Sequence, residues 1–196
     1  MKIKSYLIDT IKNVWIYYGG LSAIAKSPFV YFSLIFTLIS YNIWSHENWW
    51  NLVLEILPSL LGFTLGGYAI LVAFGDEKFM NLISGTKNAT RSPYLGLSSN
   101  FVIFILFQIL AILIALISKA LYVPLPSLLY KFLNTLSINP NKFVEIIRLL
   151  FWGFGYLLFI YSLSQTFAAT LQIFRLTKWK DKYIEDAIGS DQDDDN

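Results

Sequence analysis

The chain has 196 residues, of which 56% are hydrophobic and 14% charged, and its formal net charge is +2. A soluble domain of this size carries about 25% charged residues, so the composition predicts an integral membrane protein without a sizeable soluble domain. The small net charge gives no reason to expect direct nucleic-acid binding, and the lack of cysteine excludes disulfides, thiolate metal sites and cysteine nucleophiles.

Residues 1–27 are expected to form a cytoplasmic segment built on one amphipathic helix. Apolar and aromatic side chains of this segment share one helical face: Tyr6, Leu7, Ile11, Val14, Trp15 and Tyr18. Such a helix lies in the membrane interface, with its aromatic rings at headgroup depth. Packing against a partner protein is the alternative, and Gly19-Gly20 is expected to end the helix.

The first expected span covers residues 28–45, opens at Pro28 and contains no charge. Ser33, Thr37 and Ser40 line one side, where their hydroxyls could bond to a neighbouring helix. His46 follows in a short polar loop, where a surface histidine is expected rather than a metal ligand.

The second expected span, residues 49–74, carries one charged residue, Glu55, and is long enough to cross a bilayer. At roughly 100° per residue, five small residues fall within an arc of about 80° that also includes Glu55. These residues are Ser59, Gly62, Gly66, Ala69 and Ala73. Small side chains let helices approach closely in lipid, so the stripe is predicted to pack against another helix.

The third and fourth expected spans, residues 100–118 and 147–172, each carry a polar stripe. Together with Glu55, their polar residues form a candidate polar path: Gln108, Arg148, Ser162, Gln165 and Thr166. The alternative interpretation is that the stripes are packing faces only, with Gln108 making a hydrogen bond between helices.

The carboxyl-terminal tail, residues 176–196, is basic first and then acidic. A basic cluster at the membrane boundary is expected to attract lipid headgroups: Arg175, Lys178, Lys180 and Lys182. The acidic end is interpreted as a solvated tail or, alternatively, as a docking peptide for a basic partner.

These elements predict an all-α integral membrane protein with four transmembrane helices in residues 28–175 and amphipathic interfacial helices, one of them near residues 128–136. With four spans, eleven lysines and arginines fall on the side of both termini and four on the other side. The positive-inside rule therefore predicts cytoplasmic termini.

Catalytic chemistry is not indicated. The sequence has one histidine, no HExxH or GxSxG motif, and no pair of carboxylates within a span. Residues 84–93 lack the glycine spacing of a nucleotide-binding loop. We therefore expect a protein that is not an enzyme and has no catalytic residues, metal site or cofactor.

One stretch resembles a known class of proteins. The sequence LPSLLGFTLGGYAI at residues 57–70, followed by GDEKF at residues 75–79, is similar to small multi-span membrane effectors of bacterial anti-phage defence systems. The nearest type is the retron-associated transmembrane effector, and the four-span membrane subunit of the Kiwa system is the second. The resemblance otherwise rests on chain length and span count.

The resemblance implies a protein that perturbs or permeabilises the bacterial inner membrane, and the polar stripes suggest that it does so as a homo-oligomer. The alternative is a membrane scaffold or sensor subunit that recruits a cytoplasmic defence partner. A small transporter or lipid-handling protein is a third hypothesis.

Overall fold

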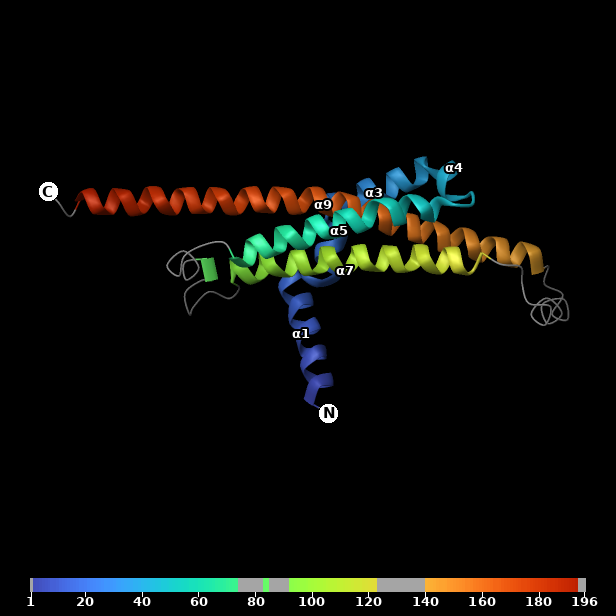
Figure 1. The fold of residues 1–196 in the computed structure, drawn as a ribbon, viewed down its shortest axis with the longest axis horizontal. Helices are drawn as coiled ribbons and strands as arrows, with labels where there is room; N and C mark the ends of the chain where they lie inside the picture. The colour runs from blue at the N-terminus through green and yellow to red at the C-terminus, as the bar shows by residue number, and fades with distance from the viewer. Residues whose placement is uncertain (1, 74–82, 85–91, 123–139, 194–196) are drawn as a thin grey trace. The chain divides into compact units, whose positions relative to one another are not determined.

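A computed structural model describes residues 2–73, 83–84, 92–122 and 140–193, in which all the regular secondary structure is helical and no strand occurs (Figure 1). The helices, in chain order, are α1 (Lys2–Tyr18), α2 (Gly20–Lys26), α3 (Pro28–Ile39), α4 (Tyr41–Trp44), α5 (Trp49–Ala73), α7 (Pro93–Ala120) and α9 (Pro140–Asp193). The interfacial helix predicted near residues 128–136 lies outside the described residues, as does most of the loop 84–93.

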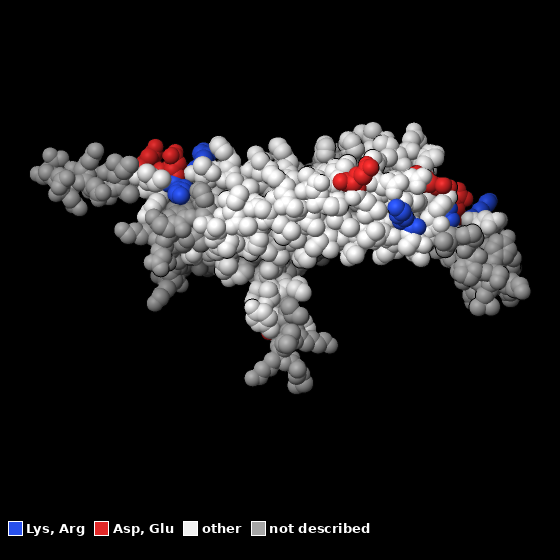
Figure 2. All heavy atoms as spheres, viewed as in Figure 1, with Lys and Arg blue, Asp and Glu red and all other residues white. Residues whose placement is uncertain are grey.

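Three helical segments are long and apolar enough to cross a membrane: Trp49–Ala73, Pro93–Ala120 and Asn141–Glu185. A fourth span results only if α2 and α3, which are bent by 59° at their junction, count as one crossing. The structure therefore gives an all-α protein with three membrane-spanning candidates. On the face drawn in Figure 2, charged side chains are sparse along the middle of the long helices.

The continuous helix expected over residues 28–45 is interrupted at Ser40, which separates α3 from α4. Trp44 explains the break, because its indole Nε1 donates a hydrogen bond of 2.7 Å to the carbonyl oxygen of Thr37. A continuous helix would use that carbonyl for the amide of Tyr41. The 12 residues of α3 reach only about 18 Å, which is too short to cross a bilayer alone.

The helix α1 includes the predicted amphipathic segment, and its apolar side chains Tyr6, Ile8, Ile11 and Ile16 are exposed. Gly19 and Gly20 have φ of 101° and 64°, a conformation that favours glycine, and they separate α1 from α2. The exposed apolar side chains agree with an interfacial position, which stays a prediction.

The chain divides into two compact units. One unit comprises Pro28–Leu61 and Phe107–Ser164, and it contains the main hydrophobic cluster. Its core side chains come from the first half of α5, the second half of α7 and the first half of α9, and they include Trp49, Val53, Leu57, Ala111, Ile114, Trp152, Tyr156 and Phe159.

Gly155 is the glycine of this unit at which an added Cβ would lie closest to neighbouring side chains. A Cβ built on Gly155 would lie 2.6 Å from the ring of Trp49 and 2.7 Å from the side chain of Ile114. The ring of Tyr156 meets Trp49 edge-on, with 6.2 Å between centroids. The missing side chain at Gly155 therefore makes the space that the buried indole fills.

The other unit comprises Met1–Ser27, Gly62–Leu106 and Gln165–Asn196. Here the second half of α5 meets the start of α7 through a hydrogen bond of 3.1 Å between the hydroxyls of Tyr68 and Ser98. A Cβ on Gly67 would lie 3.1 Å from Ile173 and 3.5 Å from Phe101. Gly67 is therefore the glycine of α5 at which neighbouring side chains approach closely within the described chain.

Candidate functional site

The small-residue stripe of α5 faces outward. Glu55, which shares the face, is exposed, and so are all five stripe residues, Ser59, Gly62, Gly66, Ala69 and Ala73. Among the described residues, no heavy atom of a neighbour lies within 4 Å of a Cβ built on Gly62 or Gly66. Packing of this stripe against another helix of the same chain is therefore not seen, and it stays a prediction about contacts between chains.

The face of α5 that packs within the chain is the opposite one. Val53, Leu57, Thr64 and Leu71 are almost completely buried, and Gly67 lies on the same side. At about 100° per residue the centre of this buried face lies about 160° from the centre of the stripe. Within the described chain, α5 thus presents a packed face and an outer face of small residues headed by a carboxylate.

The other residues of the candidate polar path are mostly buried: Gln108, Ser162, Gln165 and Thr166 are between 0% and 8% exposed. The hydroxyl of Ser162 donates 2.8 Å to the carbonyl oxygen of Leu158 in its own helix. Glu55 is exposed, whereas Gln108 and Ser162 of the same unit are buried. Within the described chain, Glu55 therefore does not share a surface with those two polar side chains.

Arg148 lies in an aromatic cluster rather than along a polar groove. Its guanidinium carbon is 5.3 Å from the ring centroid of Tyr122 and 5.6 Å from that of Trp152, distances at which cation–π attraction operates. Trp50 contacts both rings, with centroids 5.6 Å and 5.5 Å away. The sequence analysis missed this cluster, although the four-residue spacing from Arg148 to Trp152 was visible.

Tyr122 joins this cluster to Glu47, because its phenol donates a hydrogen bond to the Glu47 carboxylate. That hydrogen bond, followed by burial and the charge of Glu47, raises the pKa of Tyr122, while the charge of Arg148 acts in the opposite direction. Tyr122 is therefore a neutral hydrogen-bond donor at neutral pH, placed between an acid and a base.

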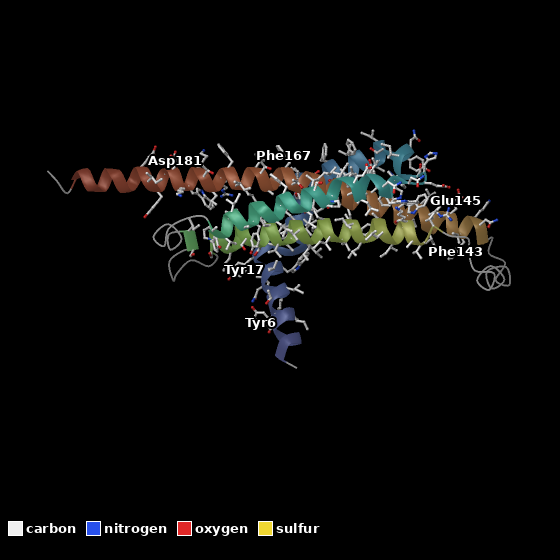
Figure 3. All side chains as sticks on the ribbon, in the orientation of Figure 1. Tyr6, Tyr17, Phe143, Glu145, Phe167 and Asp181 are labelled. Atoms are coloured by element: carbon white, nitrogen blue, oxygen red, sulfur yellow. The ribbon has the colours of Figure 1, made fainter. Side chains whose placement is uncertain are left out.

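The basic cluster lies on the carboxyl-terminal part of α9. Arg175 stacks on the ring of Trp179 at 4.8 Å, and an open hollow there is lined by Arg175, Lys178, Trp179, Asp181, Lys182 and Glu185. Figure 3 shows Asp181 on this end of α9 and Phe167 on its apolar part. The hollow mixes acidic and basic groups, and binding of lipid headgroups by Arg175, Lys178, Lys180 and Lys182 stays a prediction.

These features define the chain as an all-helical membrane protein in which α5 is packed on one face and exposed on the other. Comparisons with family models, with curated proteins and with solved structures find no match to the chain.

Proposed function

We propose that this chain is a membrane effector of an anti-phage defence system that assembles into oligomers in the bacterial inner membrane and permeabilises it. The observation that supports this function is the outer face of α5, where an acid and small residues are exposed along a membrane-spanning helix. Both termini are cytoplasmic in this proposal, as the distribution of lysine and arginine favours.

The physical argument starts from the energetics of helices in lipid. A hydrophobic drive does not operate between helices in a bilayer, so close contact through small residues is what holds them together. Gly62 and Gly66 have no neighbour within 4 Å in the described chain and can admit a second helix. A carboxylate such as Glu55 is costly in hydrocarbon and gains from water or a partner.

Copies of the chain that meet through this face bring their Glu55 and Ser59 side chains around a shared axis. A ring of carboxylates at the mouth of a narrow path attracts cations. The buried polar residues Gln108 and Ser162 then act as packing residues within each chain, which is the alternative already considered for the polar stripes.

The test is induced expression in bacteria carrying a membrane-potential dye. We expect the wild-type chain to depolarise the membrane and slow growth, and Gly62→Leu with Gly66→Leu to abolish both effects. Gly96→Leu is the matched control, because a Cβ on Gly96 also meets no neighbour among the described residues. Unchanged polarisation with the wild type, or equal depolarisation by the double variant, would count against the proposal.

A second candidate function, a scaffold or sensor subunit for a cytoplasmic defence partner, is supported by the length of α9. This helix has 54 residues and so measures about 80 Å, far more than the 30 Å of a bilayer core. Residues 173–193 extend about 30 Å beyond the predicted span. This extension carries the exposed charged residues Lys178, Asp181 and Lys182.

Affinity purification with and without residues 176–196 tests the scaffold function. We expect a soluble partner to copurify with the full chain and to be lost after truncation, since the extension supplies the charged surface. If truncation leaves every partner bound, the extension is not the docking element.

A further inference from the structure

The ends of α5, α7 and α9 in one unit carry a cluster that the proposed function does not use. It comprises Glu47, Trp50, Tyr122, Arg148 and Trp152, all within the unit formed by Pro28–Leu61 and Phe107–Ser164. The cluster places an acid, a base and three aromatic rings together where the helices end, which makes it a candidate binding site.

The rings form a prearranged support for the base. Trp50 and Trp152 are 3% and 5% exposed, and the centroids of Trp152 and Tyr122 are 6.2 Å apart. Because packing holds the Trp152 ring, it gives the Arg148 guanidinium that lies over it a fixed aromatic neighbour. The aromatic contacts therefore restrict the side-chain conformations of Arg148 before a ligand binds.

The hydrogen-bonding edge of Arg148 is available. In the part of the chain that the structure describes, Arg148 makes cation–π contacts with Tyr122 and Trp152 but no hydrogen bond or ion pair. A guanidinium presents its N–H groups in a planar fork, which matches two oxygens of a phosphate. The cation–π contacts of Arg148 do not use its N–H groups as hydrogen-bond donors, so these groups remain for such a ligand.

Glu47 provides the opposite charge. Its side chain is exposed, and it accepts the hydrogen bond from the phenol of Tyr122. A carboxylate has more acceptor positions than one phenol occupies, so Glu47 can also accept from an ammonium group. Tyr122 meets both charged groups, because its hydroxyl donates to the Glu47 carboxylate and the Arg148 guanidinium lies over its ring.

We propose that this cluster binds the headgroup of a zwitterionic phospholipid of the phosphoethanolamine type, with its phosphate on Arg148 and its ammonium on Glu47. Aromatic rings at the ends of spanning helices lie at headgroup depth, which is where these two groups are found. A headgroup that carries only the negative charge meets Arg148 but is repelled by Glu47. The primary ammonium therefore determines the selectivity of the site.

The experiment is native mass spectrometry of the full chain purified in detergent. Phosphatidylethanolamine, phosphatidylglycerol or phosphatidylcholine with identical acyl chains is added, and inorganic phosphate is added in a separate arm. We expect the wild type to retain phosphatidylethanolamine in preference to the other two lipids. Arg148→Gln should lower retention about tenfold, as expected for the loss of hydrogen bonds to a charged group.

The remaining variants separate the two halves of the site. Glu47→Gln should remove the preference for phosphatidylethanolamine over phosphatidylglycerol while leaving phosphate-dependent retention. Arg148→Lys keeps the charge but not the planar fork and should retain less lipid than wild type in a folded protein. Lys142→Gln and Glu145→Gln are charge-matched controls in the first turns of α9, where Figure 3 labels Glu145, and they should leave retention unchanged.

Three results would overturn the proposal. Equal retention of all lipids by wild type and Arg148→Gln would show that the cluster does not bind a headgroup. A preference for phosphatidylglycerol that Glu47→Gln leaves unchanged would assign an anionic lipid instead. Displacement of phosphatidylethanolamine by inorganic phosphate at equal concentration would assign the site to free phosphate.

Discussion

Gly155 is the residue on which the packing of one unit depends most directly. Its hydrogen atom occupies the position where a Cβ would meet Trp49 at 2.6 Å and Ile114 at 2.7 Å. Trp49 is 1% exposed and is therefore surrounded by other atoms, so its ring has little space into which to move.

We expect Gly155→Ala to destabilise the protein by about 1–3 kcal/mol, because overpacking a dense core forces side chains away from their preferred rotamers. Gly96→Ala is the control, since a Cβ there meets no described neighbour and alanine favours a helix over glycine by about 1 kcal/mol. Thermal unfolding in detergent measures both. Equal midpoints for Gly155→Ala and wild type would contradict the close packing.

The ionisation of the single residue Tyr122 gives a second prediction, which is tested by varying the pH. Its pKa is raised above the ordinary value of 10.0, chiefly by the hydrogen bond to Glu47. A raised pKa means that the neutral phenol stabilises the folded state below the unfolded pKa, and that this contribution is lost as pH rises through the folded pKa.

We therefore expect the ultraviolet signal of phenolate, taken as the difference between wild type and Tyr122→Phe, to appear above pH 10. Glu47→Gln should move the transition back toward the ordinary pKa, because the neutral amide no longer opposes ionisation. A Tyr122 transition at or below pH 10 in the wild type would show that the bond to Glu47 does not form.

Individual contacts of this kind could be predicted only in part. Helical spacing placed Arg148 on the polar side at the outer end of its helix, but its partner Tyr122 is distant in sequence. Nothing in the sequence indicated that the ring of Trp49 would fill the space beside Gly155. Pairings between distant segments depend on helix rotation, which a single sequence does not define.

At the scale of the element, α5 illustrates why rotation is difficult to predict in membrane proteins. The buried residues Val53 and Leu57 are as apolar as the exposed Phe63 and Leu65. Hydrophobicity therefore does not distinguish the packed face from the outer face. The small-residue spacing predicts a packing face, which is exposed within the described chain, and it does not specify whether another chain covers that face.

The break between α3 and α4 was also not predictable, because neither proline nor glycine marks it. It depends on Trp44, whose indole donates to the Thr37 carbonyl, and a Cβ on Gly153 would lie 3.1 Å from this ring. The close approach of Gly153 and the hydrogen bond to Thr37 thus hold the same indole.

Trp44→Phe should loosen this break, because the Thr37 carbonyl loses its donor, at a cost of about 1–3 kcal/mol. We expect slower hydrogen exchange of the Tyr41 amide in this variant, because the freed Thr37 carbonyl can accept from that amide as in a continuous helix. Tyr41→Phe is the matched control, since it removes only an exposed hydroxyl and keeps the ring that meets Trp44 edge-on. Unchanged exchange in Trp44→Phe would show that the indole does not maintain the break.

At the scale of the whole molecule, composition and helix length were sufficient to predict the class of protein. Three helical segments meet the length and apolarity of a membrane span. The first expected span, residues 28–45, is divided between α3 and α4, and α3 meets the criteria of a span only together with α2 across a bend of 59°. Neither composition nor helix length defines what covers the outer face of α5, because that depends on the number of chains in the assembly.

The mass of the purified protein in detergent shows how many chains assemble. One chain is 22.5 kDa, and we expect light scattering corrected for detergent to give a multiple of this mass. Gly62→Leu with Gly66→Leu should shift the protein toward the monomer, since leucine side chains hold apart two helices that glycine allows to touch. A Cβ at Gly62 or Gly66 meets no described neighbour within the chain, and both positions are exposed, so we expect the double variant to keep its fold and Gly96→Leu to keep the wild-type mass. A wild-type monomer across the accessible concentration range would mean that lipid covers the outer face of α5, and a conduit built from that face would then have no structural basis.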